Sequence, residues 1–217
     1  MTGVQTCALP ISVEGKIRGG KLIIIPHGSL HYLPFAALMD EQGKYLLEKY
    51  QISYLPSASV KKYLIPKKRK ELNTLLAFGN PDLYSDTRPA LEYAEWEVKT
   101  IGGLFARKAV YTSTGAREDV FKKLAGDYDI LHLACHSDLN PAYPMFSGLL
   151  LSPGEGEDGE LDVHEIFSMD LDASLIVLSS CQTALGTLTN GDDLVGLSRA
   201  FFYAGTPSLV ASLWMVE

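Results

Sequence analysis

A histidine and a cysteine each follow an apolar segment that has the composition of a buried β-strand. His136 comes after residues 129–134, and Cys181 comes after residues 174–179. Open α/β sheets bind their ligands beyond the carboxyl ends of their strands. If these two strands are neighbours, the imidazole of His136 can take the proton of the Cys181 thiol and make it a nucleophile. The two residues therefore indicate nucleophilic catalysis by a thiolate, with a histidine as the base.

The other polar and sulfur-containing residues near these strand ends are expected to have structural roles. Successive side chains of a strand point to opposite faces, so Cys135 cannot share the orientation of His136. His132 does share it, but four residues of strand separate the two by about 13 Å, which is too far for a common metal ion. Asp138 could orient His136, although an acid in a loop after a strand is common. No C-x-x-C pair or zinc-type Cys/His spacing occurs, and we expect neither a metal site nor a disulfide framework.

Two acids, Asp192 and Asp193, stand shortly after Cys181 and directly before an apolar helical segment. Acids at the start of a helix cap it and stabilise its positive end, which is the simpler interpretation. The functional interpretation is a specificity pocket that binds a basic P1 side chain of a substrate. The sequence leaves both interpretations open.

The segments that would position these residues alternate between strand-like and helix-like patterns. Apolar, β-branched runs predict strands, and apolar residues at helical spacing predict helices. Such alternation is typical of an α/β fold with a mostly parallel sheet, and no shift in composition marks a boundary between two domains. We expect strands at 21–25, 52–55, 74–78, 110–112, 129–134, 148–152, 174–179 and 208–214, and helices at 57–65, 89–105, 116–124, 163–167 and 194–204.

The composition excludes several classes of protein. The chain has 217 residues, of which 47% are hydrophobic and 21% are charged, as in a packed globular domain. No apolar run approaches the roughly 20 residues that a membrane span needs, and the net charge of −7 disfavours binding to nucleic acid. The absence of a G-x-x-x-x-G-K-[ST] motif makes a nucleotide-binding protein a weak alternative. The acids of residues 151–170 and the bases of residues 61–70 are expected in solvated loops.

Both ends of the chain look incomplete. The first twelve residues, MTGVQTCALPIS, carry no charge and show no clear period, and they resemble a translated sequencing-adapter remnant. We therefore set residues 1–12, which include Cys7, aside as a non-native segment. At the other end, the apolar run from residue 208 reads as a buried strand with no closing element after it. We expect residues 13–217 to be a single domain that is truncated at its carboxyl end.

Four stretches of the sequence resemble the CHAT domain, a caspase-like domain that is often attached to tetratricopeptide repeats and is related to separases and caspases. The second and third stretches are specific in combination, because His136 precedes Cys181 by 45 residues, near the spacing of about 50 in caspases. Papain-like proteases have the opposite order. The four stretches are IIIPHGSLHYLPFAAL (23–38), DILHLACHS (129–137), LIVLSSCQTALG (175–186) and GLSRAFFYAGTPSLVASLW (196–214).

The resemblance implies a fold and a site. The fold is a caspase-like three-layer sandwich, in which helices flank a mostly parallel central sheet. The site is a cysteine peptidase dyad, with Cys181 as the nucleophile and His136 as the general base and later the acid. The backbone N–H groups of Cys181 and Ser137 form the oxyanion hole. Ser137 stands where many relatives have glycine, but a backbone donor is kept whatever the side chain.

The resemblance also implies an activity and partners. The activity is endopeptidase cleavage of a protein or peptide substrate, without a metal or an organic cofactor. A tetratricopeptide-repeat region outside this chain would recognise the substrate and gate the site, and no nucleic-acid or membrane partner is expected. Apart from Cys7, the chain has two cysteines and no disulfide framework, which fits a reducing cytoplasm. The alternative is a non-catalytic signalling or protein-interaction module on the same fold, and the presence of both dyad residues favours the enzyme.

Overall fold

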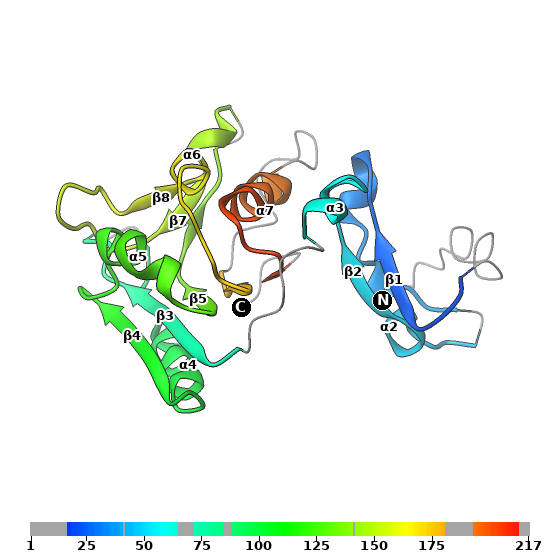
Figure 1. Cartoon of the computed structure of the whole chain (residues 1–217), viewed down its shortest axis with the longest axis horizontal. Helices are drawn as coiled ribbons and strands as arrows, with labels where there is room; N and C mark the ends of the chain where they lie inside the picture. Colours follow the sequence, from blue (N-terminus) through cyan, green and yellow to red (C-terminus); the bar gives the residue numbers. More distant parts are fainter. Residues whose placement is uncertain are drawn as a thin grey trace. The chain divides into compact units, whose positions relative to one another are not determined.

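The chain divides into two compact units, residues 1–63 and residues 64–217 (Figure 1). The computed structural model describes residues 17–40, 42–64, 72–84, 88–140, 142–180 and 193–212, with the backbone alone at residues 29, 32 and 193–195. The sequence pattern predicted no internal boundary, and the difference has a physical reason. Alternating strands and helices identify elements but not pairing partners, and the first two strands form a sheet of their own.

The first unit is built on a short parallel pair of strands. β1 (Lys21–Ile24) pairs with β2 (Gln51–Tyr54), and both agree closely with the predicted strands. Phe35 is buried in this unit, and its ring centroid lies 6.3 Å from that of Tyr54. The remaining elements are η1 (Gly28–Tyr32), η2 (Phe35–Ala37), α2 (Leu46–Lys49) and α3 (Val60–Leu64).

The second unit contains a five-stranded parallel sheet with the strand order β10-β9-β5-β3-β4. Each of the five strands overlaps a segment that the sequence pattern predicted to be a strand. The central position of β5 explains why its residues are buried on both faces. The elements are β3 (Thr74–Pro81), α4 (Glu92–Gly102), β4 (Arg107–Ser113), α5 (Glu118–Leu124), η3 (Ala125–Asp127), β5 (Ile130–Ala134), β9 (Leu175–Leu178), α7 (Asp193–Ala204) and β10 (Leu209–Ala211).

A small antiparallel sheet is inserted between β5 and β9. Its order is β6-β7-β8, and its middle strand is the one that the sequence predicted. The outer two strands have only two or three residues, too few to show a period. Residues 154–159 match the G-x-G-x-x-G pattern. They connect β7 to β8 and are not followed by a helix, whereas a dinucleotide-binding motif must be at the start of a helix. The elements are β6 (Ser137–Asp138), η4 (Pro144–Phe146), β7 (Gly148–Leu150), β8 (Glu160–Asp162) and α6 (Val163–Ile166).

The parallel sheet is covered by helices on both faces. α4 packs on one face against β3, β4 and β5, while α5, on the other side, packs with the larger core (Figure 1). That larger core also takes in apolar side chains of α6 and α7. The core under α4 is smaller and includes Val98 and Ala134. This arrangement confirms the predicted α/β class, and it is consistent with a caspase-like fold.

Gly79, near the end of β3, allows α4 to lie unusually close to the sheet. A Cβ atom at this position would come within 2.6 Å of both the Ala94 carbonyl oxygen and the Val98 side chain. These contacts are far shorter than van der Waals distance, so α4 can keep its place only while residue 79 has no side chain. The glycine thus sets the height of α4 above the sheet.

Replacing Gly79 with alanine is expected to lower the free energy of unfolding by about 2 kcal/mol, because the new methyl group must displace α4. Urea unfolding measures the change. Gly196→Ala is the matched control, since a Cβ atom there meets nothing within 4 Å and the residue lies inside α7. Helix propensity then predicts a gain of about 0.5–1 kcal/mol. Equal effects of the two substitutions would contradict the close approach of α4.

Candidate active site

The strands that precede the two predicted catalytic residues are neighbours in the parallel sheet. β5 pairs with β9 from Ile130↔Leu175 to Leu133↔Leu178. The ladder continues one step beyond β9, where the Ser179 N–H donates to the Leu133 carbonyl at 2.8 Å. The condition on which the Cys/His pairing depended is therefore met. Cys181 and Asp192 themselves lie outside the described residues, and Asp193 is the first residue of α7, described in its backbone alone.

His136 is half-buried, and one of its ring nitrogens contacts a backbone carbonyl. Nε2 of His136 lies 2.9 Å from the Pro89 oxygen. A carbonyl oxygen only accepts hydrogen bonds, so in the neutral imidazole the proton is on Nε2 and Nδ1 carries the free lone pair. The partner thus fixes both the tautomer and the orientation of the ring, and Nδ1 is the atom that can act as a base.

The contact with His136 depends on where α4 begins. The sequence predicted a helix from residue 89, whereas α4 starts at Glu92. The segment before it is held in a non-helical path because the Leu91 N–H donates to Asn80 Oδ1 at 2.6 Å. In that path the Pro89 carbonyl is free to accept from His136. Sequence reasoning missed this group, because a backbone carbonyl leaves no signal in the residue type.

The carboxylate of Asp138 contacts Arg88. The group that contacts the His136 ring is the Pro89 carbonyl. Arg88 Nη2 lies 3.2 Å from Asp138 Oδ2, and Arg88 Nη1 lies 3.5 Å from the Ser137 carbonyl. Asp138 had been considered as a group that orients His136. In the structure, the segment at residues 88–89 instead holds the segment at residues 136–138 through these contacts.

The backbone N–H of Ser137 points away from the neighbouring strand β7. The Leu150 N–H donates to the His136 carbonyl at 2.8 Å, while Ser137 pairs with Leu149. Residues next to a hydrogen-bonded pair form a non-hydrogen-bonded pair in an antiparallel ladder, and their N–H and C=O groups point outward. The contact between Arg88 and the Ser137 carbonyl lies on that outward side. The β6–β7 ladder therefore does not use the Ser137 N–H, and Ser137 as a whole is fully buried.

Cys135 is buried in the larger core, as the alternation of side chains predicted. The residue is 0% exposed, and it packs in a different core cluster from Ala134. Burial raises the pKa of its thiol to about 12. A thiol with that pKa carries almost no thiolate at neutral pH and is a structural residue.

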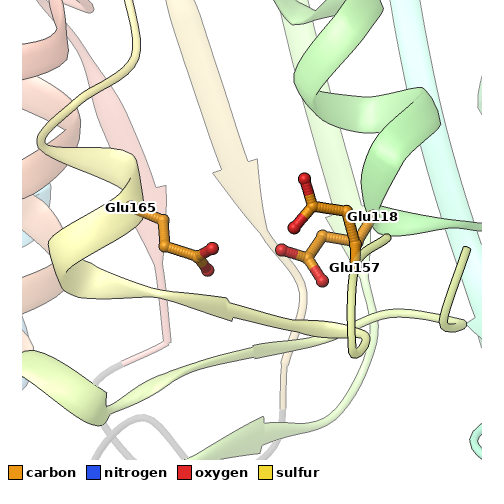
Figure 2. Close-up of side chains that lie close together, drawn as sticks. All are labelled: Glu118, Glu157 and Glu165. Atoms are coloured by element: carbon orange, nitrogen blue, oxygen red, sulfur yellow. The ribbon is translucent and has the colours of Figure 1, made fainter. Parts of the chain in front are cut away.

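Three glutamates form the one cluster in the described part of the chain with the spacing of a metal site. One carboxylate oxygen each of Glu118, Glu157 and Glu165 lies within 4.8 Å of the others, and Figure 2 shows the side chains turned toward one another. Lys122 Nζ lies 2.7, 2.7 and 2.6 Å from Glu118, Glu157 and Glu165 respectively. The Lys122 ammonium group stands where a metal ion would bind. Its three contacts connect α5 to α6 and to the loop before β8.

The cluster corrects the expectation of solvated acids in residues 151–170 for Glu157 and Glu165, while Glu155, Asp158, Glu160 and Asp170 are exposed as expected. Glu118, on α5, is 0% exposed. Burial raises the pKa of its carboxyl group, and hydrogen bonds from Lys122 and the Gly159 N–H lower it by less, so the pKa stays above its ordinary value. Burial also raises the pKa of Glu165, but hydrogen bonds from Lys122 and the Asp162 N–H outweigh it and lower the pKa. For Lys122 burial lowers the pKa, and the three carboxylates more than reverse this. The lysine therefore stays charged while the protein is folded.

The fold and the site together define a caspase-like α/β domain, with a histidine just beyond the central strand of a parallel sheet. The family model of the CHAT domain matches residues 4–217. The chain thus belongs to the CHAT domain family. The matched range includes residues 4–12, although their composition had indicated a non-native segment.

Two curated relatives are named as tetratricopeptide repeat proteins. Tetratricopeptide repeat protein 28 of Homo sapiens is 25% identical over 247 residues, which cover 92% of this chain and 10% of that protein. The Mus musculus protein of the same name is 26% identical over 251 residues, with the same coverage. This chain thus spans about a tenth of the length of either relative. In the described residues, each helix is too short or too polar to cross a bilayer.

Proposed function

We propose that this CHAT domain is a cysteine endopeptidase, with Cys181 as the nucleophile and His136 as the general base. The observation that carries the proposal is the parallel pairing of β5 with β9, which brings the segments before both residues to one edge of the sheet. The Pro89 carbonyl supports it, because its hydrogen bond with Nε2 leaves Nδ1 of His136 free to accept a proton. A base oriented by a third group is the usual arrangement around an activated nucleophile.

The proposed reaction is acyl transfer in two steps. Nδ1 of His136 takes the thiol proton, and the Cys181 sulfur attacks the carbonyl carbon of the scissile peptide bond. The Ser137 and Cys181 N–H groups stabilise the oxygen that becomes negative. As the carbon–nitrogen bond breaks, His136 gives its proton to the leaving amine. A water molecule then attacks the thioester, His136 takes one of its protons, and the thiol and a carboxylic acid are released.

The substrate class and setting follow from the same proposal. The substrate would be a protein or peptide, and the names of the two relatives support a tetratricopeptide-repeat region as the partner that recognises it. The described free cysteine, Cys135, fits a reducing compartment, and a cytoplasmic location is part of the proposal. Asp193, the first residue of α7, and Asp192, which precedes it in the sequence, are proposed to bind a basic P1 side chain.

The rate of alkylation of each cysteine against pH tests the dyad without a known substrate. We expect Cys181 to react with iodoacetamide with an apparent pKa well below the ordinary value of about 8.5. His136→Ala should return the apparent pKa to the ordinary range. Cys135 is the internal reference, since burial raises its pKa to about 12 and it should react only after unfolding. Mass spectrometry of the labelled peptides resolves the cysteines.

The opposite outcome is equally clear. If Cys181 reacts with an ordinary pKa, or if His136→Ala leaves its pH profile unchanged, the dyad is not formed. The non-catalytic interaction module on the same fold would then be the better account.

A further inference from the structure

Glu97 of α4 connects the two strands that lead to the candidate dyad. Its Oε1 lies 2.9 Å from Nε2 of His132, which is on β5. Its Oε2 accepts a hydrogen bond of 3.1 Å from the Ser179 hydroxyl, directly after β9. A single carboxylate therefore holds β5 and the end of β9 together, four residues before His136 and two residues before Cys181.

The contacts are built into the packing of α4 on the sheet. Gly79 lets α4 come close to β3 at Val98, the residue next to Glu97. His132 is 4% exposed, and burial lowers its pKa although Glu97 opposes that effect. The contact requires a proton on Nε2 of His132, which the carboxylate accepts. Buried polar groups with a full set of partners hold a structure in one geometry.

The carboxylate of Glu97 also accepts a hydrogen bond from the hydroxyl of Ser179, which is outside the strand and close in sequence to Cys181. Ser180 offers a direct contrast. It is 1% exposed, and its hydroxyl has no hydrogen-bond partner among the described residues. Ser179 is the serine of the pair whose hydroxyl has a partner on another element among the described residues.

We propose that Glu97 is a positioning residue, which sets the path of the chain from β9 to the nucleophile by holding Ser179 and His132 in place. The inference rests on the proposed function. Glu97 and Ser179 take no part in bond making. They act by keeping the chain after β9 at a fixed distance from the segment that carries His136, and a shift of about an ångström at a reacting group can cost a factor of about 100.

The test is the pH profile of Cys181 alkylation in variants that remove or keep the hydroxyl. In Ser179→Ala we expect the apparent pKa of Cys181 to rise toward about 8.5 and the rate at pH 6.5 to fall about tenfold. Ser179→Thr keeps the donor and should restore the rate to within about twofold. Ser180→Ala removes a neighbouring buried hydroxyl that has no described partner, and it should leave the profile unchanged. Melting temperatures of all variants show whether the fold is affected equally.

Glu97→Ala tests the same contacts by a substitution on α4, without changing the sequence of β5 or of the segment after β9. It should lower the rate at pH 6.5 by a factor similar to that of Ser179→Ala, and the double variant should be no slower than the slower single one, as for residues that act together. Glu92→Ala removes an exposed carboxylate from the same helix and is its control.

The outcomes separate this proposal from the one on which it rests. If wild-type Cys181 shows a His136-dependent low pKa and Ser179→Ala and Glu97→Ala keep it, the positioning role is overturned and the dyad stands. The role is also overturned if Ser180→Ala slows the reaction as much as Ser179→Ala. If wild-type Cys181 has an ordinary pKa that His136→Ala does not change, the proposed function fails and the positioning role fails with it.

Discussion

Replacing Cys181 or His136 with alanine is expected to lower peptide hydrolysis by at least about a thousandfold. Members of a nucleophile–base pair act as one unit, so either loss removes covalent catalysis and leaves what binding and the oxyanion hole supply. For the same reason, the double variant should be no worse than the slower single one. A fluorogenic peptide library, with each basic and apolar side chain at P1, gives the hydrolysis rates.

Cys135→Ala is the matched control for this prediction. It removes a thiol that is next to His136 in sequence but is buried in the core, so the rate should change by less than about twofold. Cleavage that persists in Cys181→Ala would assign the activity to another residue. The same library tests the acidic residues, because Asp192→Ala or Asp193→Ala should lower any preference for Arg or Lys at P1.

Replacing Lys122 with alanine is expected to lower the free energy of unfolding by about 3 kcal/mol at pH 7. The substitution leaves three carboxylates facing one another, and Glu118 is fully buried. Removing one partner of a buried ion pair typically costs about 3–5 kcal/mol, because the remaining charge is uncompensated, and partial exposure of Lys122 places the effect at the lower end. For a chain of this size the melting temperature should fall by about 10 °C. Differential scanning calorimetry measures it.

The pH dependence gives this prediction a definite sign. The pKa of Glu118 in the folded protein is raised above its ordinary value of 4.5, and loss of the ammonium raises it further. A folded state that binds more protons than the unfolded state gains stability as the pH falls. The deficit of Lys122→Ala should therefore be largest at pH 7 and should shrink toward pH 5. For Glu165, burial raises the pKa but hydrogen bonds from Lys122 and the Asp162 N–H lower it below the ordinary value of 4.5. Its contribution to stability is therefore kept between pH 7 and pH 5 and is lost only at lower pH.

Lys123→Ala is the control for the ion network. Lys123 is the next residue of α5, and it is exposed, so its loss should change the free energy of unfolding by less than about 0.5 kcal/mol. An equal loss at pH 5 and pH 7 in Lys122→Ala, or an equal effect of the two lysine variants, would show that the network does not carry the stability.

The positions of the strands could be predicted well from the sequence, and the boundaries of the helices less well. Apolar, β-branched runs such as residues 175–178 report burial directly, because a strand inside a parallel sheet has both faces covered. α4 was predicted to begin at residue 89 and begins at Glu92, because a hydrogen bond between Leu91 and Asn80 holds the preceding segment away from the helix. This hydrogen bond joins residues eleven positions apart, so the pattern of neighbouring residues around Leu91 could not predict it.

The candidate site shows the same division. The side-chain types and their spacing pointed to His136 and Cys181, and strand alternation separated Cys135 from them. The Pro89 carbonyl, the Lys122 network and the contacts of Glu97 were not predicted. Each joins elements that are far apart in the chain, and each depends on which helix lies over which strand.

The sequence by itself determined the α/β class, the family resemblance, and the residue types that could act as nucleophile and base. These depend on periodicity and composition, which are local properties of the chain. Tertiary structure alone decided that β5 lies beside β9, that Nδ1 of His136 is the free nitrogen, and that the acids near α6 surround a lysine. Pairing and burial arise from contacts between distant segments, so a one-dimensional pattern identifies the groups and only the fold gives them their partners.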